Sequence, residues 1–252
     1  SIEIPDSVES IGDGAFYNCN SLTSITIPDS VTSIGGSAFY SCDSLTSVTI
    51  GDSVESIGDS AFYNCHSLTS VTIPDSVKSI GEGAFGQCAL IRIDLPDGLE
   101  TIEMGTFFGC TNLSEITIPD SVKTIGESAF QDCISLTEIT IPYGVESIEK
   151  WAFLRCTNLY KITIPDSVKH IGMSVFFDCI SLSEISIPDN VETIGDGAFA
   201  NCGNIKELTI PDSITSTGEL SFYNCPNIVV TYKGKTYTYA EITDLYNAIN
   251  YQ

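Results

Sequence analysis

Apolar and polar residues alternate in a frame that repeats about every 23 residues. The unit that starts at Ile27 reads IPDSVTSIGGSAFYSCDSLTSVT, and the same frame runs on to a unit that starts at Ile210. Where one unit passes into the next, Ile25 and Ile27 alternate with Thr26, which predicts a strand with one buried face. We expect Pro28 to end this strand, because proline has no amide proton for a ladder hydrogen bond.

The second half of each unit predicts a short extended segment and a tight turn. Val31 and Ile34 bring the chain back to the core, and Gly35 is expected to adopt a positive φ. Phe39 and Cys42 then fit one irregular or 3₁₀-type turn, which is too short to be stable as an isolated helix.

Ten cysteines mark the repeats, at intervals of 23 residues apart from one interval of 22. The shorter interval follows from a one-residue deletion between Cys88 and Leu90, which we expect a loop to absorb. Because a single unit cannot bury its own apolar side chains, the units must stack in register and share one core. The cysteines are Cys19, Cys42, Cys65, Cys88, Cys110, Cys133, Cys156, Cys179, Cys202 and Cys225.

The pattern L-x-x-I-x-I-P, followed by V-x-x-I-G-x-x-A-F-x-x-C, resembles the BspA-like (Treponema pallidum type) leucine-rich repeat. The resemblance covers residues 1 to about 228, with local departures such as Gly51 in the proline column and Glu103 and Glu149 in the glycine column. It implies a solenoid of about ten repeats, with a parallel β-sheet on one face and short extended segments and 3₁₀ or irregular turns elsewhere.

The chain leaves the repeat frame after Cys225. Residues 228–232 and 236–239 are strand-like and flank a Lys-Gly-Lys sequence that is typical of a hairpin turn. Thr238 and Glu241 form a capping box before one apolar helical face, made of Ile242, Leu245, Tyr246 and Ile249. We therefore predict two domains, a leucine-rich repeat solenoid over residues 1–228 and a C-terminal cap of a hairpin and a short helix over residues 229–252.

The net charge is −23, from 33 acidic and 10 basic residues, although 42% of the chain is hydrophobic. A charge of this sign repels phosphate backbones, so binding of nucleic acid through a basic patch is excluded. Anionic membrane surfaces are disfavoured for the same reason, and no apolar run has the length that a spanning helix needs.

The cysteine column has three interpretations: free buried thiols, disulfides between neighbouring units, and zinc ligands. Stacked neighbours about 5 Å apart lie within disulfide range, but their side chains point in the same direction. Cys-x₂-Cys pairs are absent and His66 and His170 fall in different columns, which argues against zinc. Free thiols acting as small hydrophobic residues are favoured, and no cofactor or metal site is predicted.

Two further columns carry charge. An Asp follows nearly every proline, as Asp29 follows Pro28, which favours an Asx turn in each unit over a ladder of Ca²⁺ sites. The second column alternates in sign over seven units, and we interpret it as a solvated face that relieves self-repulsion. Its residues are Glu55, Lys78, Glu100, Lys123, Glu146, Lys169 and Glu192.

The exposed strand positions are the first candidate binding surface for a protein or a glycan. The early units place hydroxyl groups there, although Thr is also simply a good exposed strand residue. The later units are acidic and are interrupted by Lys161 beside Tyr160. The candidate residues are Ser24, Thr26, Ser47, Thr49, Ser70, Thr72, Glu115, Glu138, Tyr160 and Lys161.

A second candidate surface is the aromatic column of Tyr17, Tyr40 and Tyr63. These three side chains suit either an exposed stacking strip that contacts a partner or packing across loops.

Catalysis finds little support in the sequence. The chain has two histidines and neither an H-E-x-x-H, a G-x-S-x-G nor a phosphate-cradling glycine motif. The family resemblance implies surface adhesins of host-associated bacteria, so our main hypothesis is a non-catalytic, secreted or cell-surface interaction module. The alternative is a structural spacer, or a rod that self-associates end to end through the open N-terminal units. Removal of upstream repeats from a longer protein is a second explanation for an open end at this position.

Overall fold

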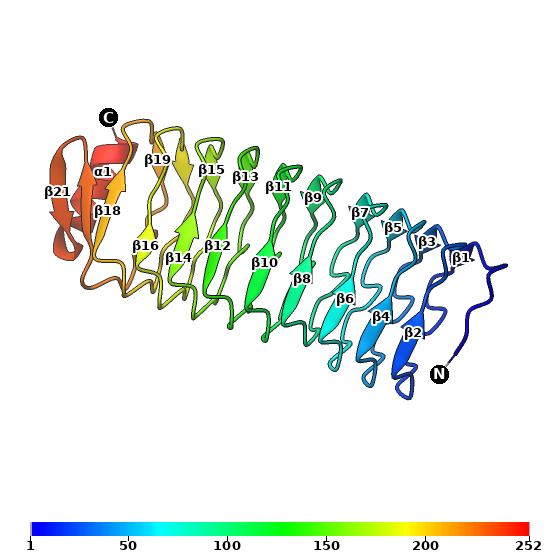
Figure 1. Ribbon diagram of the computed structural model, residues 1–252. Helices are drawn as coiled ribbons and strands as arrows, with labels where there is room; N and C mark the ends of the chain where they lie inside the picture. Colours follow the sequence, from blue (N-terminus) through cyan, green and yellow to red (C-terminus); the bar gives the residue numbers. More distant parts are fainter. Residues whose placement is uncertain (1, 252) are drawn as a thin grey trace.

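Each unit of about 23 residues forms one coil of a solenoid, and the coils stack in register along a rod (Figure 1). The computed structural model describes residues 2–251, so residues 1 and 252, the outer bounds of the two predicted domains, lie outside it. Each coil contributes one strand to a first parallel sheet and one to a second. The predicted solenoid fold is confirmed.

The first sheet contains the predicted strands, in which an apolar residue points inward between two exposed polar ones. In β2 this buried residue is Ile25, and Ile27 beyond the strand is also buried. The strands are β2 (Ser24–Thr26), β4 (Ser47–Thr49), β6 (Ser70–Thr72), β8 (Arg92–Asp94), β10 (Glu115–Thr117), β12 (Glu138–Thr140), β14 (Lys161–Thr163), β16 (Glu184–Ile185) and β18 (Glu207–Ile210).

The extended segments form a second parallel sheet, which the sequence did not reveal as a sheet. Its strands have only two residues each, the second of which is buried in the core. They are β1 (Ser10–Ile11), β3 (Ser33–Ile34), β5 (Ser56–Ile57), β7 (Ser79–Ile80), β9 (Thr101–Ile102), β11 (Thr124–Ile125), β13 (Ser147–Ile148), β15 (His170–Ile171), β17 (Thr193–Ile194) and β19 (Ser216–Thr217).

One stack of phenylalanine rings runs through the core along the rod. Neighbouring rings lie nearly parallel, from Phe16 and Phe39 at 5.0 Å between centroids to Phe199 and Phe222 at 5.7 Å. Each stacked pair contributes about 0.5–1.5 kcal/mol beyond the burial of its surface. The widest spacing, 6.1 Å, separates Phe85 from Phe107, where one coil is a residue shorter than the others.

The shortened coil disturbs the stacking more than the sequence predicted. Both sheets are interrupted at this point, between β6 and β8 in the first and between β7 and β9 in the second. The deletion therefore costs the strand pairing of both sheets at this point, although the two coils stay joined by backbone hydrogen bonds, such as that from the Phe85 N–H to the Thr106 carbonyl at 3.0 Å.

Gly35, which follows β3 in the second sheet, has a different structural role from the one we expected. Gly35 does not have a positive φ; Ser37 at 53° and Ser41 at 52° have it instead. A Cβ on Gly35 would lie 2.6 Å from the backbone nitrogen of Asp13 in the preceding coil, much closer than such atoms pack. Glycine is needed here because two coils approach closely, so the expectation of a positive φ was wrong.

The cysteines are free and stack beside the phenylalanines, which confirms the favoured interpretation. Each thiol from Cys42 onward donates a hydrogen bond to the carbonyl of the phenylalanine in the preceding coil, as Cys65 does to Phe39 at 3.2 Å. Burial raises the pKa of Cys110 to about 12. A thiol in this state is a poor nucleophile, because only the thiolate reacts.

A hairpin and a helix cover the C-terminal coil, as the sequence predicted. β20 (Val229–Tyr232) pairs in parallel with β18 and antiparallel with β21 (Lys235–Thr238). A 3₁₀ turn, η1 (Tyr239–Glu241), precedes α1 (Ile242–Asn250), and the predicted capping box is present. Leu245 and Ile249 of α1 are buried, and the Asn250 side chain makes two hydrogen bonds with the backbone of Thr217 in β19.

Candidate interaction surface

The outward side chains of the first sheet form a continuous polar face. In its early part, β2, β4 and β6 pair in register, so the hydroxyl-bearing positions align from coil to coil. All six predicted residues of this part are exposed: Ser24, Thr26, Ser47, Thr49, Ser70 and Thr72. The register thus brings this half of the predicted surface together.

In the later part of the sheet, the pairing of strands follows the charge of one outward column. Arg92 of β8 lies opposite Glu115 of β10, and these strands pair. Lys161 of β14 lies between Glu138 of β12 and Glu184 of β16, and these three strands also pair. Lys161 approaches Glu184 to 3.7 Å.

The sheet is interrupted where this column places two carboxylates next to each other. No strand pairing joins β10 to β12, where Glu115 meets Glu138, or β16 to β18, where Glu184 meets Glu207, among the described strands. Directly opposed like charges on neighbouring strands are destabilising by roughly 0.2–1 kcal/mol. That cost gives a physical reason for the two interruptions.

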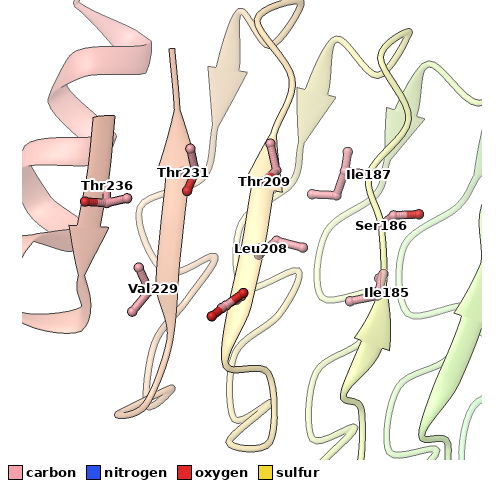
Figure 2. A pocket seen from close by; sticks show the side chains of 9 residues that line it. Ile185, Ser186, Ile187, Leu208, Thr209, Val229, Thr231 and Thr236 are labelled. Carbon is pink, nitrogen blue, oxygen red and sulfur yellow. The ribbon is translucent and has the colours of Figure 1, made fainter. Parts of the chain in front are cut away.

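Each interruption opens a shallow trough in the face. The trough between β10 and β12 is lined by Glu115, Ile116, Glu138 and neighbouring hydroxyl groups. The other lies beside β18 and extends towards β21, as Figure 2 shows with Ile185 and Thr209 among its lining residues. Ile116 and Ile185 are half-buried, whereas their counterparts in the other coils of this sheet are buried.

The three predicted tyrosines form a stack of their own. Ring centroids lie 5.0 Å apart between Tyr17 and Tyr40 and 5.5 Å apart between Tyr40 and Tyr63. Tyr17 is exposed, and the other two are half-buried. The stack stops at Gly86, where a Cβ would collide with the Tyr63 ring at 2.5 Å. These rings lie in the turns that lead from the second sheet back to the first, so they do not join the polar face.

The alternating column outside the first sheet is a solvated face, as expected, whereas Asp29 in the Asp column does not make the expected Asx turn. In the Asp column, Asp29 accepts a hydrogen bond from the backbone N–H of Asp52 in the next coil, at 2.9 Å, and not from its own turn. In the alternating column, Lys78 and Glu55 are the two neighbours that form an ion pair within 4 Å among the described residues. Both columns are exposed, and exposed pairs of this kind contribute little stability.

No set of three or more His, Cys, Asp and Glu side chains in residues 2–251 is placed to hold a metal ion. His66 contacts the backbone oxygen of Gln87, and His170 contacts the hydroxyl of Thr193. Over the same residues, no helix has the length and apolar character needed to cross a bilayer.

Sequence reasoning missed Glu184 and Glu207 as members of the surface. The sequence predicted that the outward positions of the later units are acidic. It did not predict the troughs, because a gap between strands depends on which coils pair. Their like charges, placed next to each other in the column, were the available signal. Tyr160, which we predicted, is exposed beside β14.

Comparisons with known proteins agree with this architecture. A family model described as a BspA type leucine rich repeat region, in six copies, matches residues 1–114 and 100–229. A leucine-rich repeat protein from Bacteroides ovatus ATCC 8483 is similar with a TM-score of 0.85 and 32% identity. The match covers 91% of this chain and 62% of the B. ovatus chain, so the present chain spans less than two thirds of that protein's structure.

Two further solved structures are similar at lower levels. The T. pallidum leucine rich repeat protein has a TM-score of 0.52 and 27% identity, over 73% of this chain and 78% of that one. The pneumococcal vaccine antigen PcpA has a TM-score of 0.61 and 24% identity, over 90% of this chain and 61% of that one, a likeness of fold alone. No curated protein matches the chain.

Proposed function

Because the chain belongs to the BspA-type leucine-rich repeat family, we propose that it is a non-catalytic interaction module that binds a protein or a glycan across the first sheet. We propose a secreted or cell-surface location on the family relationship alone. A regular solenoid of this kind offers a long polar face and shallow troughs, which suit an extended partner better than a small substrate.

One observation carries the proposal. Along the first sheet the inward positions keep the same apolar types from coil to coil, whereas one outward column changes from serines to charged residues and the other keeps Thr or Ser apart from Asp94. Packing accounts for the inward positions, but it does not account for a surface whose chemistry is divided into two zones. Exposed variable side chains on a rigid scaffold are where binding specificity usually lies.

Glycan and matrix-protein arrays test the proposal. Three surface variants would be compared with the original chain: Ser47→Glu with Thr49→Glu in the hydroxyl zone, Tyr17→Ala with Tyr40→Ala in the stack, and charge-neutralised glutamates in the acidic zone. We expect a hit that one of the two first-sheet variants abolishes and that the tyrosine variant, which lies outside that sheet, leaves unchanged. An array without hits, or hits that survive both first-sheet variants, would overturn the proposal.

A second candidate function is end-to-end association into a longer rod. In the first described coil, Ile4, Val8 and Phe16 are only half-buried, whereas the matching side chains of later coils are buried. Stacking of another coil on these side chains would bury more apolar surface. Light scattering coupled to size-exclusion chromatography at several concentrations tests this: a monomer throughout would reject it.

A further inference from the structure

The two troughs of the first sheet are related by a simple spacing. The interruption that opens the first lies between β10 and β12 and the interruption that opens the second lies between β16 and β18, so three strand positions separate the two interruptions. Strands in a sheet lie about 4.8 Å apart, which places the two interruptions about 14 Å apart along the rod. An extended peptide covers this distance in about four residues.

Of the four glutamates at the two interruptions, only Glu184 has an ion pair within 4 Å among the described residues, although Glu115 lies opposite Arg92 and Glu138 opposite Lys161 on paired strands. Among the described residues, the ion pairs of this face join Arg92 to Asp94 and Lys161 to Glu184. Glu115, Glu138 and Glu207 have no ion pair within 4 Å, and all three are exposed. Their negative charge is therefore available to a partner that approaches from solvent.

The troughs also have a shape that suits a long side chain. Their volumes are about 670 Å³ between β10 and β12 and about 470 Å³ beside β18. Half-buried Ile116 and Ile185 give each trough an apolar part of its lining, and the glutamates lie at its edge. Lysine and arginine match this arrangement, because their aliphatic stems cover apolar surface while their charged ends reach carboxylates.

We propose that this face binds an extended basic segment of a partner protein, which runs along the rod and places Lys or Arg at positions i and i+4 into the two troughs. Lys161 lies between them, so the residue midway in the segment is neutral or acidic. This inference rests on the proposed function and specifies the chemistry of the partner. Charge complementarity favours a basic segment as the partner, and the distance between the two sheet interruptions sets the spacing of its Lys or Arg side chains.

The test measures fluorescence anisotropy with labelled nine-residue peptides. The probe GSKTSTKSG has its lysines at i and i+4, and the matched peptide GSKKTSTSG has the same composition with adjacent lysines. We expect the first to bind at least fivefold more tightly at 50 mM salt and to lose most of its affinity at 500 mM salt. Equal affinities, or no binding of either peptide, would overturn the inference.

Two triple variants separate this site from general attraction to an acidic protein. The variant E115Q, E138Q and E207Q neutralises the trough carboxylates, and the variant E100Q, E146Q and E192Q removes the same charge from the alternating column. We expect at least a tenfold loss of affinity in the first and less than twofold in the second. Equal losses would show attraction to net charge alone and would refute the site. Circular dichroism melts verify that both variants fold.

The outcomes also distinguish this inference from the proposed function. Array hits that the hydroxyl variant abolishes, together with no peptide binding, would refute the inference and leave the proposed function standing. Register-dependent peptide binding without any array hit would support the inference and count against the broader proposal of a glycan or matrix ligand.

Discussion

Replacing Gly58 by alanine should destabilise the solenoid by about 1–2 kcal/mol. The added Cβ would lie 2.6 Å from the backbone nitrogen of Gly36 and 2.7 Å from the carbonyl carbon of Gly35. Ordinary contact begins near 3.4 Å, so the two coils must separate by several tenths of an ångström. Overpacking of this kind costs about 1–3 kcal/mol, and the reduced entropy of the unfolded chain offsets roughly 0.4–1 kcal/mol. Glu149 lies in the same column, which shows that neighbouring coils can adjust and favours the lower part of this range.

Gly12 provides a matched control, because it occupies the same column and a Cβ there would meet nothing within 4 Å. Gly203 gives a second open position, in a later coil. Gly12→Ala and Gly203→Ala should be neutral or stabilising, by up to about 1 kcal/mol. The assay is the midpoint of urea unfolding followed by circular dichroism. The reasoning fails if Gly58→Ala unfolds at the same urea concentration as the original chain or at a higher one.

Glu207→Lys should place a cation beside Glu184, restore pairing between β16 and β18 and raise the free energy of unfolding by about 0.5–1 kcal/mol at low salt. Hydrogen exchange at the β18 amides checks this. A gain in stability that persists at 1 M salt would contradict the electrostatic cause. Asn250→Ala should remove the two hydrogen bonds to Thr217 and lower the local stability of the C-terminal coil by about 1–2 kcal/mol. We expect faster hydrogen exchange that is confined to β19 and α1. A uniform change in exchange along the chain would argue against a local role. Burial raises the pKa of Cys110 from 9.0 to about 12, so the unfolded chain loses this proton first as pH rises. Stability should therefore be complete below pH 9 and fall above it, by up to about 1.4 kcal/mol per pH unit for each such thiol; unfolding midpoints that stay constant from pH 9 to 11 would refute this.

The coil and its core could be predicted because their causes lie within one unit. The spacing of Ile25, Phe39 and Cys42 repeats in every coil, and burial of these side chains requires the same stacking throughout. The cap was equally readable, since the hairpin turn at Lys233 and the capping box at Thr238 are local signals.

Features that depend on how two coils meet could not be predicted in the same way. Gly35 serves a close approach to Asp13, and the carboxylate of Asp29 binds the next coil, although both residues resemble local turn formers. The second sheet was missed because a strand of two residues, such as Ser33–Ile34, has no alternation to detect. The troughs were missed because they lie where strand pairing stops, at β10 and β12 and at β16 and β18, and pairing depends on how neighbouring coils meet.

The hydrogen bonds between coils have one further consequence, for folding and for the growth of the chain in evolution. Within the solenoid they join residues 21 to 26 positions apart, as Ser30 joins Val8 and Cys42 joins Phe16. Closing a loop of this length costs about 2.8 kcal/mol plus a constant, and the cost is the same for the first coil as for the last. Adding or losing a whole unit therefore leaves the topological difficulty of folding unchanged, so the number of coils is free to vary by duplication. The one shortened coil, with its interrupted sheets, shows why such changes must come in complete units.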